Sequence, residues 1–347
     1  MRSPCRRSSL RMAISGTMGG MADVLDLRQF RSDQLDSLLR AEAAEWEREL
    51  HWDYSSSLTL IRQYIDARIL PGFVLATSRS PEARARGYGF FVYESRKGLI
   101  GDVFVQPVFR EANYREEQRL LMHMIETLQA TPGLARIESQ LMTYEPGALS
   151  RQFVRTGFQA YRRYFMSFDL AHVPAVPVGY PTEDEGVTML GEMRIEPWGR
   201  AGFDEGARLI TAAYAEHLDG LINDQYRSFP GAIRFLHNIV HYPGCGIFDA
   251  ASSFVARHQR TRQMIGLVLT SRVKDDVAHI TQICTDPAVR QQGLGSALLG
   301  RTLQSLRTQG MQSVTLTVTQ ANATAVHLYR RLGFQFLREF DAWVWNR

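Results

Sequence analysis

The stretch ITQICTDPAVRQQGLGSALLGRTLQSLRTQG, from Ile280 to Gly310, contains a segment rich in β-branched residues, a turn with glycines and a long helical run. The glycines lie where the predicted strand passes into the predicted helix. At such a junction the backbone amides of the helix N-terminus commonly bind a phosphate group. The stretch therefore predicts a phosphate-binding loop, and its surroundings must indicate which ligand carries the phosphate.

The loop RQQGLGSAL (Arg290–Leu298) departs from two nucleotide-binding motifs. A P-loop needs a Lys followed by Ser or Thr after its last glycine, and this loop has no Lys. A dinucleotide-binding fingerprint needs Gly or Ala where Leu298 stands, and an acid about 20 residues later, where the strand SVTLTVTQ offers none. The pattern that remains is R-x-x-G-x-G, with Gly293 and Gly295 as its glycines.

This pattern and its surroundings resemble the GCN5-related N-acetyltransferase (GNAT) superfamily. Members carry V-x-P at the end of the preceding strand, and here Thr285-Asp286-Pro287 has Thr in place of Val. Members also carry N-x-x-A-x-x-L-Y-x-x-x-G-F after the next strand. Every specified position of that motif is matched, by Asn322, Ala325, Leu328, Tyr329, Gly333 and Phe334. The resemblance covers roughly Met193 to Arg347.

The resemblance implies acetyl-CoA, or another acyl-CoA, as cosubstrate, and it implies no metal. The pyrophosphate would lie on the loop amides, where the helix dipole favours an anion, and Arg290 would add a charge contact. Asn322 can cap the short helix that follows it and can reach the pantetheine arm. The implied cofactor-binding residues are Ile283, Cys284, Thr285, Arg290, Gln291, Gln292, Gly293, Leu294, Gly295, Ser296 and Asn322.

The implied reaction is direct acyl transfer from coenzyme A to an amine. Tyr329 stands where the family usually has the acid that donates a proton to the thiolate. His279 stands six residues before Thr285, where some members have a catalytic Glu, and strand alternation places it on one face with Ile283. Cys284 is predicted as a core residue. Alternative bases lie on an earlier helical segment: His217, Asp219 and Asp224.

The chain carries the same plan twice. Leu25–Asp53 and Met193–Gly220 each read as a strand followed by an amphipathic helix, and GFQ opens a last strand in both halves. Pro, Gly and acids predict a linker between them. The expected division is a leader or overlong start at 1–22, a degenerate GNAT-like domain at 23–170, a linker at 171–192 and an active GNAT domain at 193–347.

The implied fold class is α/β (α+β). The resemblance to tandem GNAT proteins implies two GNAT-like domains. Each would have a mixed, mostly antiparallel sheet flanked by helices, with a V-shaped splay between its fourth and fifth strands.

The N-terminal copy keeps its fold positions but loses the chemical ones. Val105-Gln106-Pro107 matches V-x-P, whereas the following loop reads REANYR, with Asn113 and Arg115 at the expected glycine positions. Phe153 replaces the acid Tyr. The side chains would intrude on a pyrophosphate. We therefore expect this half to pack on the active half and to shape its substrate cleft.

Composition narrows the cellular setting. Four of the 40 basic residues lie in the first 22 residues, which contain no acid, and the remaining 36 equal the 36 acids. The body is therefore neutral, which gives no indication of nucleic-acid binding. Three unclustered cysteines favour a reducing compartment, and we expect the cytoplasm. No apolar run reaches the roughly 18 residues that a membrane span needs.

The sequence thus predicts an acetyl-CoA-dependent N-acetyltransferase that acts on a small-molecule or peptide amine. Glu216, Asp219 and Asp224 could attract a cationic acceptor to the C-terminal half. The alternative is a non-catalytic acyl-CoA-binding sensor or scaffold protein. Neither the acceptor nor the oligomeric state follows from these residues.

Overall fold

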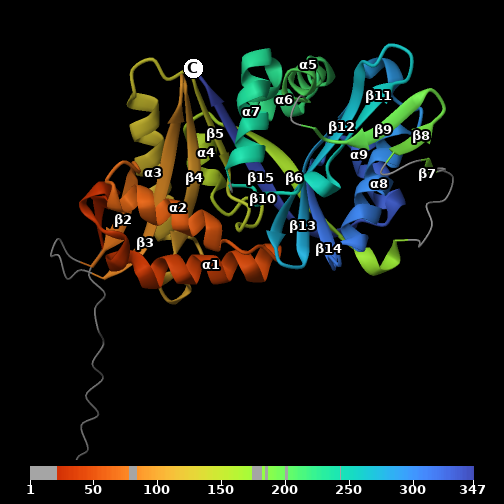
Figure 1. Ribbon diagram of the computed structural model, residues 1–347. Helices are drawn as coiled ribbons and strands as arrows, with labels where there is room; N and C mark the ends of the chain where they lie inside the picture. The colour runs from red at the N-terminus through yellow and green to blue at the C-terminus, as the bar shows by residue number, and fades with distance from the viewer. Residues whose placement is uncertain (1–21, 78–83, 174–181, 184–186, 200–201, 243) are drawn as a thin grey trace, which may run out of the picture.

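The computed structural model describes residues 22–77, 84–173, 182–183, 187–199, 202–242 and 244–347. The predicted leader, Ala22 excepted, lies outside them. In this part of the chain the strands form one mixed sheet in the order β1-β2-β3-β4-β5-β15-β6-β14-β13-β12-β11-β9-β8-β7, with β10 paired to β12. Figure 1 shows this sheet running through both halves of the molecule. The fold is mixed α/β, and one long sheet spans its two GNAT-like halves.

Within the described residues, the N-terminal half provides the first six strands and four α-helices. The strands are β1 (Asp23–Asp26), β2 (Gly72–Ala76), β3 (Ala85–Glu94), β4 (Lys97–Val105), β5 (Arg136–Gln140) and β6 (Gln159–Asp169). The helices are α1 (Asp36–Leu50), α2 (Ser55–Asp66), α3 (Arg115–Ala130) and α4 (Ser150–Arg155).

The C-terminal half repeats the plan. Its strands are β7 (Thr182–Glu183), β8 (Val187–Leu190), β9 (Met193–Pro197), β10 (Ile247–Phe248), β11 (Phe254–His258), β12 (Met264–Lys274), β13 (Val277–Thr285), β14 (Ser313–Thr319) and β15 (Gln335–Asn346). Its helices are α5 (Phe203–Ala213), α6 (Asp219–Ile222), α7 (Phe229–His241), α8 (Leu294–Thr308) and α9 (Ala323–Leu332). The predicted linker contains β7 and β8, which extend the far edge of the sheet.

Each half gives its last strand to the sheet of the other half. β15 lies between β5 and β6 and pairs antiparallel with both, and β6 pairs antiparallel with β14. The hydrophobic cores follow this exchange. Trp343 of β15 packs in the core of the N-terminal half, and Met166 and Phe168 of β6 pack in the core of the C-terminal half. Neither half therefore completes its own sheet.

Helices cover both faces of the sheet in each half. In the N-terminal half α1 and α2 pack on one face, and α3 packs on the opposite face (Figure 1). In the C-terminal half α5 and α7 pack on one face, and α8 and α9 on the other. Successive strand residues point to opposite faces, so each strand supplies two cores. This explains the long apolar runs in the central strands.

A buried charge network also joins the halves. Lys97 Nζ lies 2.6 Å from Asp224 Oδ1, 3.3 Å from Glu138 Oε2 and 3.4 Å from Glu94 Oε2. Burial lowers the pKa of Lys97, but the charges of Glu138 and Asp224 outweigh this effect and raise it. Lys97 therefore stays charged at neutral pH. Asp224, which the sequence offered as a base or acceptor-binding acid, is engaged in this network.

Candidate active site

The sheet opens between the parallel strands β13 and β14. Their pairing ends at Ile280 and Leu316, although the strands continue to Thr285 and Thr319. The pairing of β4 with β5 also stops before the end of β4. The backbone of residues 281–285 therefore faces β14 without pairing to it. This is the splay that the resemblance implies.

A β-bulge shapes the opened end of β13. The pairing of β13 with β12 shifts register at Thr281, which is an extra residue. Alternation is reversed beyond it, since Ile280 and Ile283 both pack on the α8 side whereas Cys284 packs on the α5 side. Burial raises the pKa of the Cys284 thiol to about 12, so the side chain is an inert core residue. The backbone of residues 283–285 is what this strand can offer to a ligand.

The loop that follows β13 presents a run of unpaired amides. Among the described residues, the six successive backbone amides from Gln291 to Ser296 donate no hydrogen bond. The next amide, that of Ala297, donates to the Gly293 carbonyl at 3.0 Å. Unpaired amides at a helix N-terminus favour an anionic ligand, because they donate to it and the helix dipole attracts it. The loop therefore fits a pyrophosphate group.

The two glycines of the loop have different requirements. Gly293 has φ +83°, a left-handed conformation that side chains rarely adopt, and a Cβ there would meet no atom within 4 Å. A Cβ on Gly295 would lie 3.5 Å from Leu328 Cδ2, which is an ordinary contact. The backbone conformation thus favours glycine at position 293. At position 295 the protein itself has room for a side chain, so any need for glycine comes from a ligand.

Arg290 lies exposed at the start of the loop. Its Nη2 donates to the Ala213 carbonyl at 2.8 Å, at the end of α5. A guanidinium has five N–H donors, so this contact leaves others available. Arg290 therefore ties the loop to α5 and keeps its charge beside the unpaired amides.

Asn322 connects the start of α9 with the loop after α5. Its Oδ1 accepts a hydrogen bond from the Ala325 amide at 3.2 Å, and its Nδ2 lies 3.3 Å from His217 Nε2. His217 Nδ1 accepts from the Asp219 amide at 3.2 Å. The Asp219 carboxylate accepts from the Thr319 hydroxyl at the end of β14. The structure thus brings two of the alternative bases together with Asn322 at the opened end of the sheet.

Tyr329 reaches the same region from α9. Its ring is buried and lies edge-on to Phe334, with ring centroids 5.7 Å apart. Burial raises the pKa of Tyr329 above its ordinary value; the charge of Asp219 adds to this effect and that of Arg163 opposes it. The hydroxyl therefore keeps its proton at neutral pH. Arg163 belongs to β6, so the exchanged strand contributes a charge to this region.

Two residues of this region carried no signal in the sequence. Tyr214 donates from its hydroxyl to the Ile283 carbonyl at 3.3 Å, and Gln282 Nε2 donates to the Tyr214 hydroxyl at 3.2 Å. Burial raises the pKa of Tyr214 well above its usual value. No motif marks either side chain, because only the packing of α5 on β13 places them beside the opened strand.

The structure does not bring His279 to this cluster. His279 pairs with Thr315 in the closed part of the sheet, and its Nδ1 lies 2.8 Å from Thr315 Oγ1. Its ring lies 5.1 Å from that of Trp52 and 5.8 Å from that of Phe165, both from the N-terminal half. Burial lowers the pKa of His279 to about 3, so the imidazole is neutral. The bulge at Thr281 reverses the alternation on which its expected position rested.

The corresponding loop of the N-terminal half closes on itself. Between its 3-10 helix and α3, this loop is one residue longer than the loop between the corresponding 3-10 helix and α8. Tyr114, with φ +52°, therefore takes the place of Gly293. The Tyr114 amide donates to the Glu111 carbonyl at 2.9 Å. Asn113 Oδ1 accepts from the Arg115 amide at 3.2 Å. The loop thus uses part of its own donor set, and the register of the two copies differs by one residue from that expected.

Side chains fill the opened end of the N-terminal sheet. Tyr144, which follows β5, donates to the Val103 carbonyl of β4 at 2.7 Å. Phe153 occupies the position that Tyr329 has in the other half, and its ring stacks on that of Trp343 at 4.8 Å. Tyr144 and Phe153 are both buried. No hydroxyl replaces that of Tyr329 at this position.

Among the residues that the structure describes, no group of three or more His, Cys, Asp or Glu side chains could hold a metal ion. None of the helices in the described ranges is long and apolar enough to cross a membrane.

Comparisons with known proteins agree with this geometry. Residues 218–334 match the acetyltransferase (GNAT) family. Over 87 residues the chain is 34% identical to mycothiol acetyltransferase of Thermomonospora curvata, which covers 25% of this chain and 29% of that protein. Over 72 residues it is 38% identical to the ribosomal protein bS18 alanine N-acetyltransferase of Escherichia coli K12, covering 21% and 48% respectively.

Solved structures resemble the chain over most of its length. A tandem GNAT protein from the clavulanic acid biosynthesis pathway, determined without acetyl-CoA, superposes with a TM-score of 0.57. The superposition covers 93% of this chain and 98% of that one at 13% identity, so it concerns the fold alone. The chain spans less than half the length of both curated relatives.

Proposed function

This chain belongs to the GNAT superfamily, with the family domain at residues 218–334, and from this premise we propose that it transfers an acetyl group from acetyl-CoA to an amine. The observation that carries the proposal is the run of unpaired amides from Gln291 to Ser296 beside the opened end of β13. An anion-binding loop next to an unpaired strand end suits a cosubstrate with a pyrophosphate at one end and a thioester at the other.

The residues of the C-terminal half fit this cosubstrate. The amides of residues 291–296 would hold the pyrophosphate, and Arg290 would add charge from the edge of the loop. The backbone of residues 283–285, which pairs with β12 but not with β14, would meet the pantetheine arm and the thioester carbonyl on the β14 side. Bound acetyl-CoA supplies an acetyl thioester and a thiol leaving group. Asn322, already fixed as the cap of α9, would line the arm.

Tyr329 is proposed as the acid. Its raised pKa keeps the proton on Oη at neutral pH, so the hydroxyl is available as a hydrogen-bond donor. A partly negative sulfur is stabilised by such a donor in a site of low dielectric. This role agrees with the position of Tyr329 in the family motif.

His217 replaces His279 as the proposed base. A neutral imidazole accepts a proton through one of its ring nitrogens, and the contacts with Asp219 and Asn322 hold the ring at the opened end of the sheet. Asp219 would stabilise the imidazolium that forms, since its Oδ2 lies 3.6 Å from His217 Nδ1. The proton of the acceptor amine would pass to His217 directly or through one water.

The proposal assigns catalysis to the half at 193–347 and a non-catalytic role to the half at 23–170. The two curated relatives are named for mycothiol and for an alanine of a ribosomal protein. Both a small-molecule amine and a peptide amine are therefore suitable acceptors to test. A cytoplasmic location is part of the proposal and depends on the cysteine usage alone.

The test uses Gly293→Glu, which places a negative charge where the pyrophosphate would lie. We expect coenzyme A release with an active amine to fall about 100-fold or more, equivalent to about 3 kcal/mol of lost binding. Acetyl-CoA should also no longer raise the melting temperature. Gly310→Glu is the matched control, because Gly310 has φ +80° and its Cβ would also meet no atom within 4 Å.

Three outcomes separate the alternatives. Loss of activity in Gly293→Glu but not in Gly310→Glu supports the proposal. Saturable acetyl-CoA binding without turnover on broad amine and peptide panels would favour the sensor. A parent protein that acetyl-CoA neither binds nor stabilises would contradict both.

A further inference from the structure

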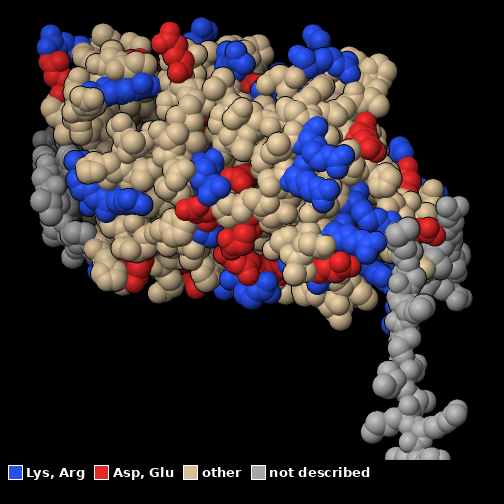
Figure 2. Space-filling view, turned by 180° about the vertical axis from the view of Figure 1, so that it is seen from behind, with Lys and Arg blue, Asp and Glu red and all other residues tan. Residues whose placement is uncertain are grey.

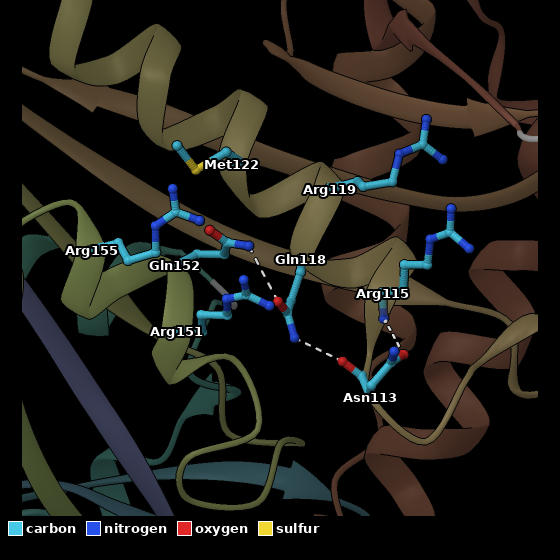
Figure 3. Close-up of a pocket in the computed structure, with 8 residues that line it drawn as sticks. All are labelled: Asn113, Arg115, Gln118, Arg119, Met122, Arg151, Gln152 and Arg155. Carbon is cyan, nitrogen blue, oxygen red and sulfur yellow. Dashed lines mark hydrogen bonds between the residues drawn. The ribbon is translucent and has the colours of Figure 1, made fainter.

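A pocket lined by basic side chains lies in the half that lacks the glycine loop. A pocket of about 390 Å³ is formed by α3, α4 and the loop before α3. Four arginines and two glutamines line it, and no acid does: Arg115, Gln118, Arg119, Arg151, Gln152 and Arg155. Figure 3 shows these side chains around the pocket, and Figure 2 shows basic side chains gathered on the molecule as seen from behind. We propose that this pocket binds a compact ligand with two or more phosphate groups.

The charge on the α4 side is unneutralised. Arg151 and Arg155 lie one helical turn apart and are both exposed. In the part of the chain that the structure describes, neither side chain has an ion pair or a hydrogen bond. Like charges at i and i+4 repel each other and destabilise a helix. An anion bound between them would convert that repulsion into attraction.

The α3 side supplies donors that are already oriented. Arg119 pairs with Glu116 at 2.6 Å and donates to the Ala22 carbonyl at 2.8 Å, so its side chain is held in place. Gln152 Nε2 donates to Gln118 Oε1 at 3.2 Å across the pocket (Figure 3). Guanidinium and amide donors from two helices can contact several phosphate oxygens at once. A ligand with a single phosphate group would leave some of these hydrogen-bond donors without a partner.

The surroundings limit the shape of the ligand. α3 and α4 correspond to α8 and α9, so the pocket lies on the side where the other half has its proposed cosubstrate loop. Here, however, the hydroxyl of Tyr144 occupies the Val103 carbonyl at the opened end of the sheet. Because the side chains of Tyr144 and Val103 are buried in a packed core, a pantetheine-like arm has no route inward. The pocket therefore suits a free diphosphate or a nucleoside diphosphate rather than a thioester.

The experiment uses the full chain carrying Gly293→Glu, so that the other loop cannot contribute. Calorimetric titration measures the affinity for pyrophosphate, ADP, inorganic phosphate and coenzyme A. It thus distinguishes a free diphosphate from a nucleoside diphosphate, a single phosphate and a thiol cosubstrate. We expect saturable binding of pyrophosphate or ADP that weakens at least tenfold in Arg151→Ala/Arg155→Ala. Arg84→Ala/Arg272→Ala removes two other exposed arginines and should leave binding unchanged. The single variant Arg155→Gln, which removes one charge but keeps a polar side chain, should give an intermediate loss.

Several results would overturn the proposal. These are absence of saturable binding by both diphosphates, binding that the pocket variants leave unchanged, and binding of coenzyme A or of inorganic phosphate alone. The same titration in the parent protein saturated with acetyl-CoA measures diphosphate binding to the pocket independently of the Gly293→Glu change. If acetyl-CoA does not bind at all, that failure concerns the proposed function and leaves the comparison of pocket variants intact.

Discussion

Tyr329 can act as an acid only through a hydrogen bond that strengthens as the sulfur becomes negative. A free thiol of the cysteine type has a pKa of about 8.5 and a free tyrosine about 10. Burial raises the pKa of Tyr329 further. Complete proton transfer to the thiolate would therefore be uphill, whereas donation of a hydrogen bond requires no transfer. The same burial that fixes the side chain would thus limit the proposed role of Tyr329 to stabilising the leaving group.

Replacing Tyr329 by Phe tests this role at the scale of one hydroxyl. We expect the turnover rate to fall about 100-fold, within the range for loss of one hydrogen-bond donor to a developing negative charge. The acetyl-CoA dissociation constant should change less than about threefold, because the ring remains in place against Phe334. Steady-state kinetics and titration with acetyl-CoA measure the two quantities. An unchanged turnover rate would remove Tyr329 from the mechanism.

Residues identified by a motif and residues identified by an isolated position had different outcomes. Tyr329 and Asn322 come from a spaced motif, and the structure places both near the opened strand. His279 rested on a single family position and on strand alternation, and the structure places it in the core, before a bulge that reverses the alternation. Gln282 and Tyr214 were missed, because a glutamine in a strand and a tyrosine after a helix are ordinary. A motif constrains several positions at once, whereas alternation fails with a single inserted residue.

At the scale of the element, the strand exchange joins the two halves. β6 and β15 lie beside each other and each completes the sheet of the other half. Removing a half would leave an unpaired strand edge and an open core next to it. Several individual strands were readable from the sequence, since β6, β9, β13, β14 and β15 overlap the predicted segments. Their partners were not.

Separate expression of residues 22–173 and 187–347 tests the exchange. We expect neither fragment to give a cooperative unfolding transition alone, because each lacks one strand of its sheet. Adding Gln335–Asn346 by a short glycine-serine linker to the first fragment should restore a cooperative transition. Circular dichroism during heating and size-exclusion chromatography report the result. Two independently stable fragments would contradict the exchange as a stabilising feature.

At the scale of the whole molecule, the network around Lys97 links the first half to the segment between α6 and α7. Lys97 is 4% exposed and contacts acids from both halves. Burying charges is costly unless they are paired, so removing the central cation leaves Glu138 and Asp224 poorly compensated. The network thus favours one docking arrangement of the halves over others.

Lys97→Met should therefore destabilise the protein strongly. Loss of one partner from a buried ion pair costs about 3–5 kcal/mol, and we expect about 3 kcal/mol because Arg136 still pairs with Glu138. Arg234→Met is the control, since Arg234 also pairs with an acid of this network, Glu94, but is 50% exposed. It should cost less than about 1 kcal/mol. Urea unfolding measures both, and equal effects would contradict the importance of burial.

The glycine loop, the duplicated plan and the absence of the motif residues from the first copy could all be predicted from the sequence. These features depend on glycines, spaced motifs and local periodicity, which act over a few residues. The strand exchange, the burial of His279 between the halves and the arginine pocket between α3 and α4 became visible with the three-dimensional structure. The physical reason is that pairing partners and shared cavities depend on contacts between residues far apart in the chain, where local patterns are equally compatible with several neighbours.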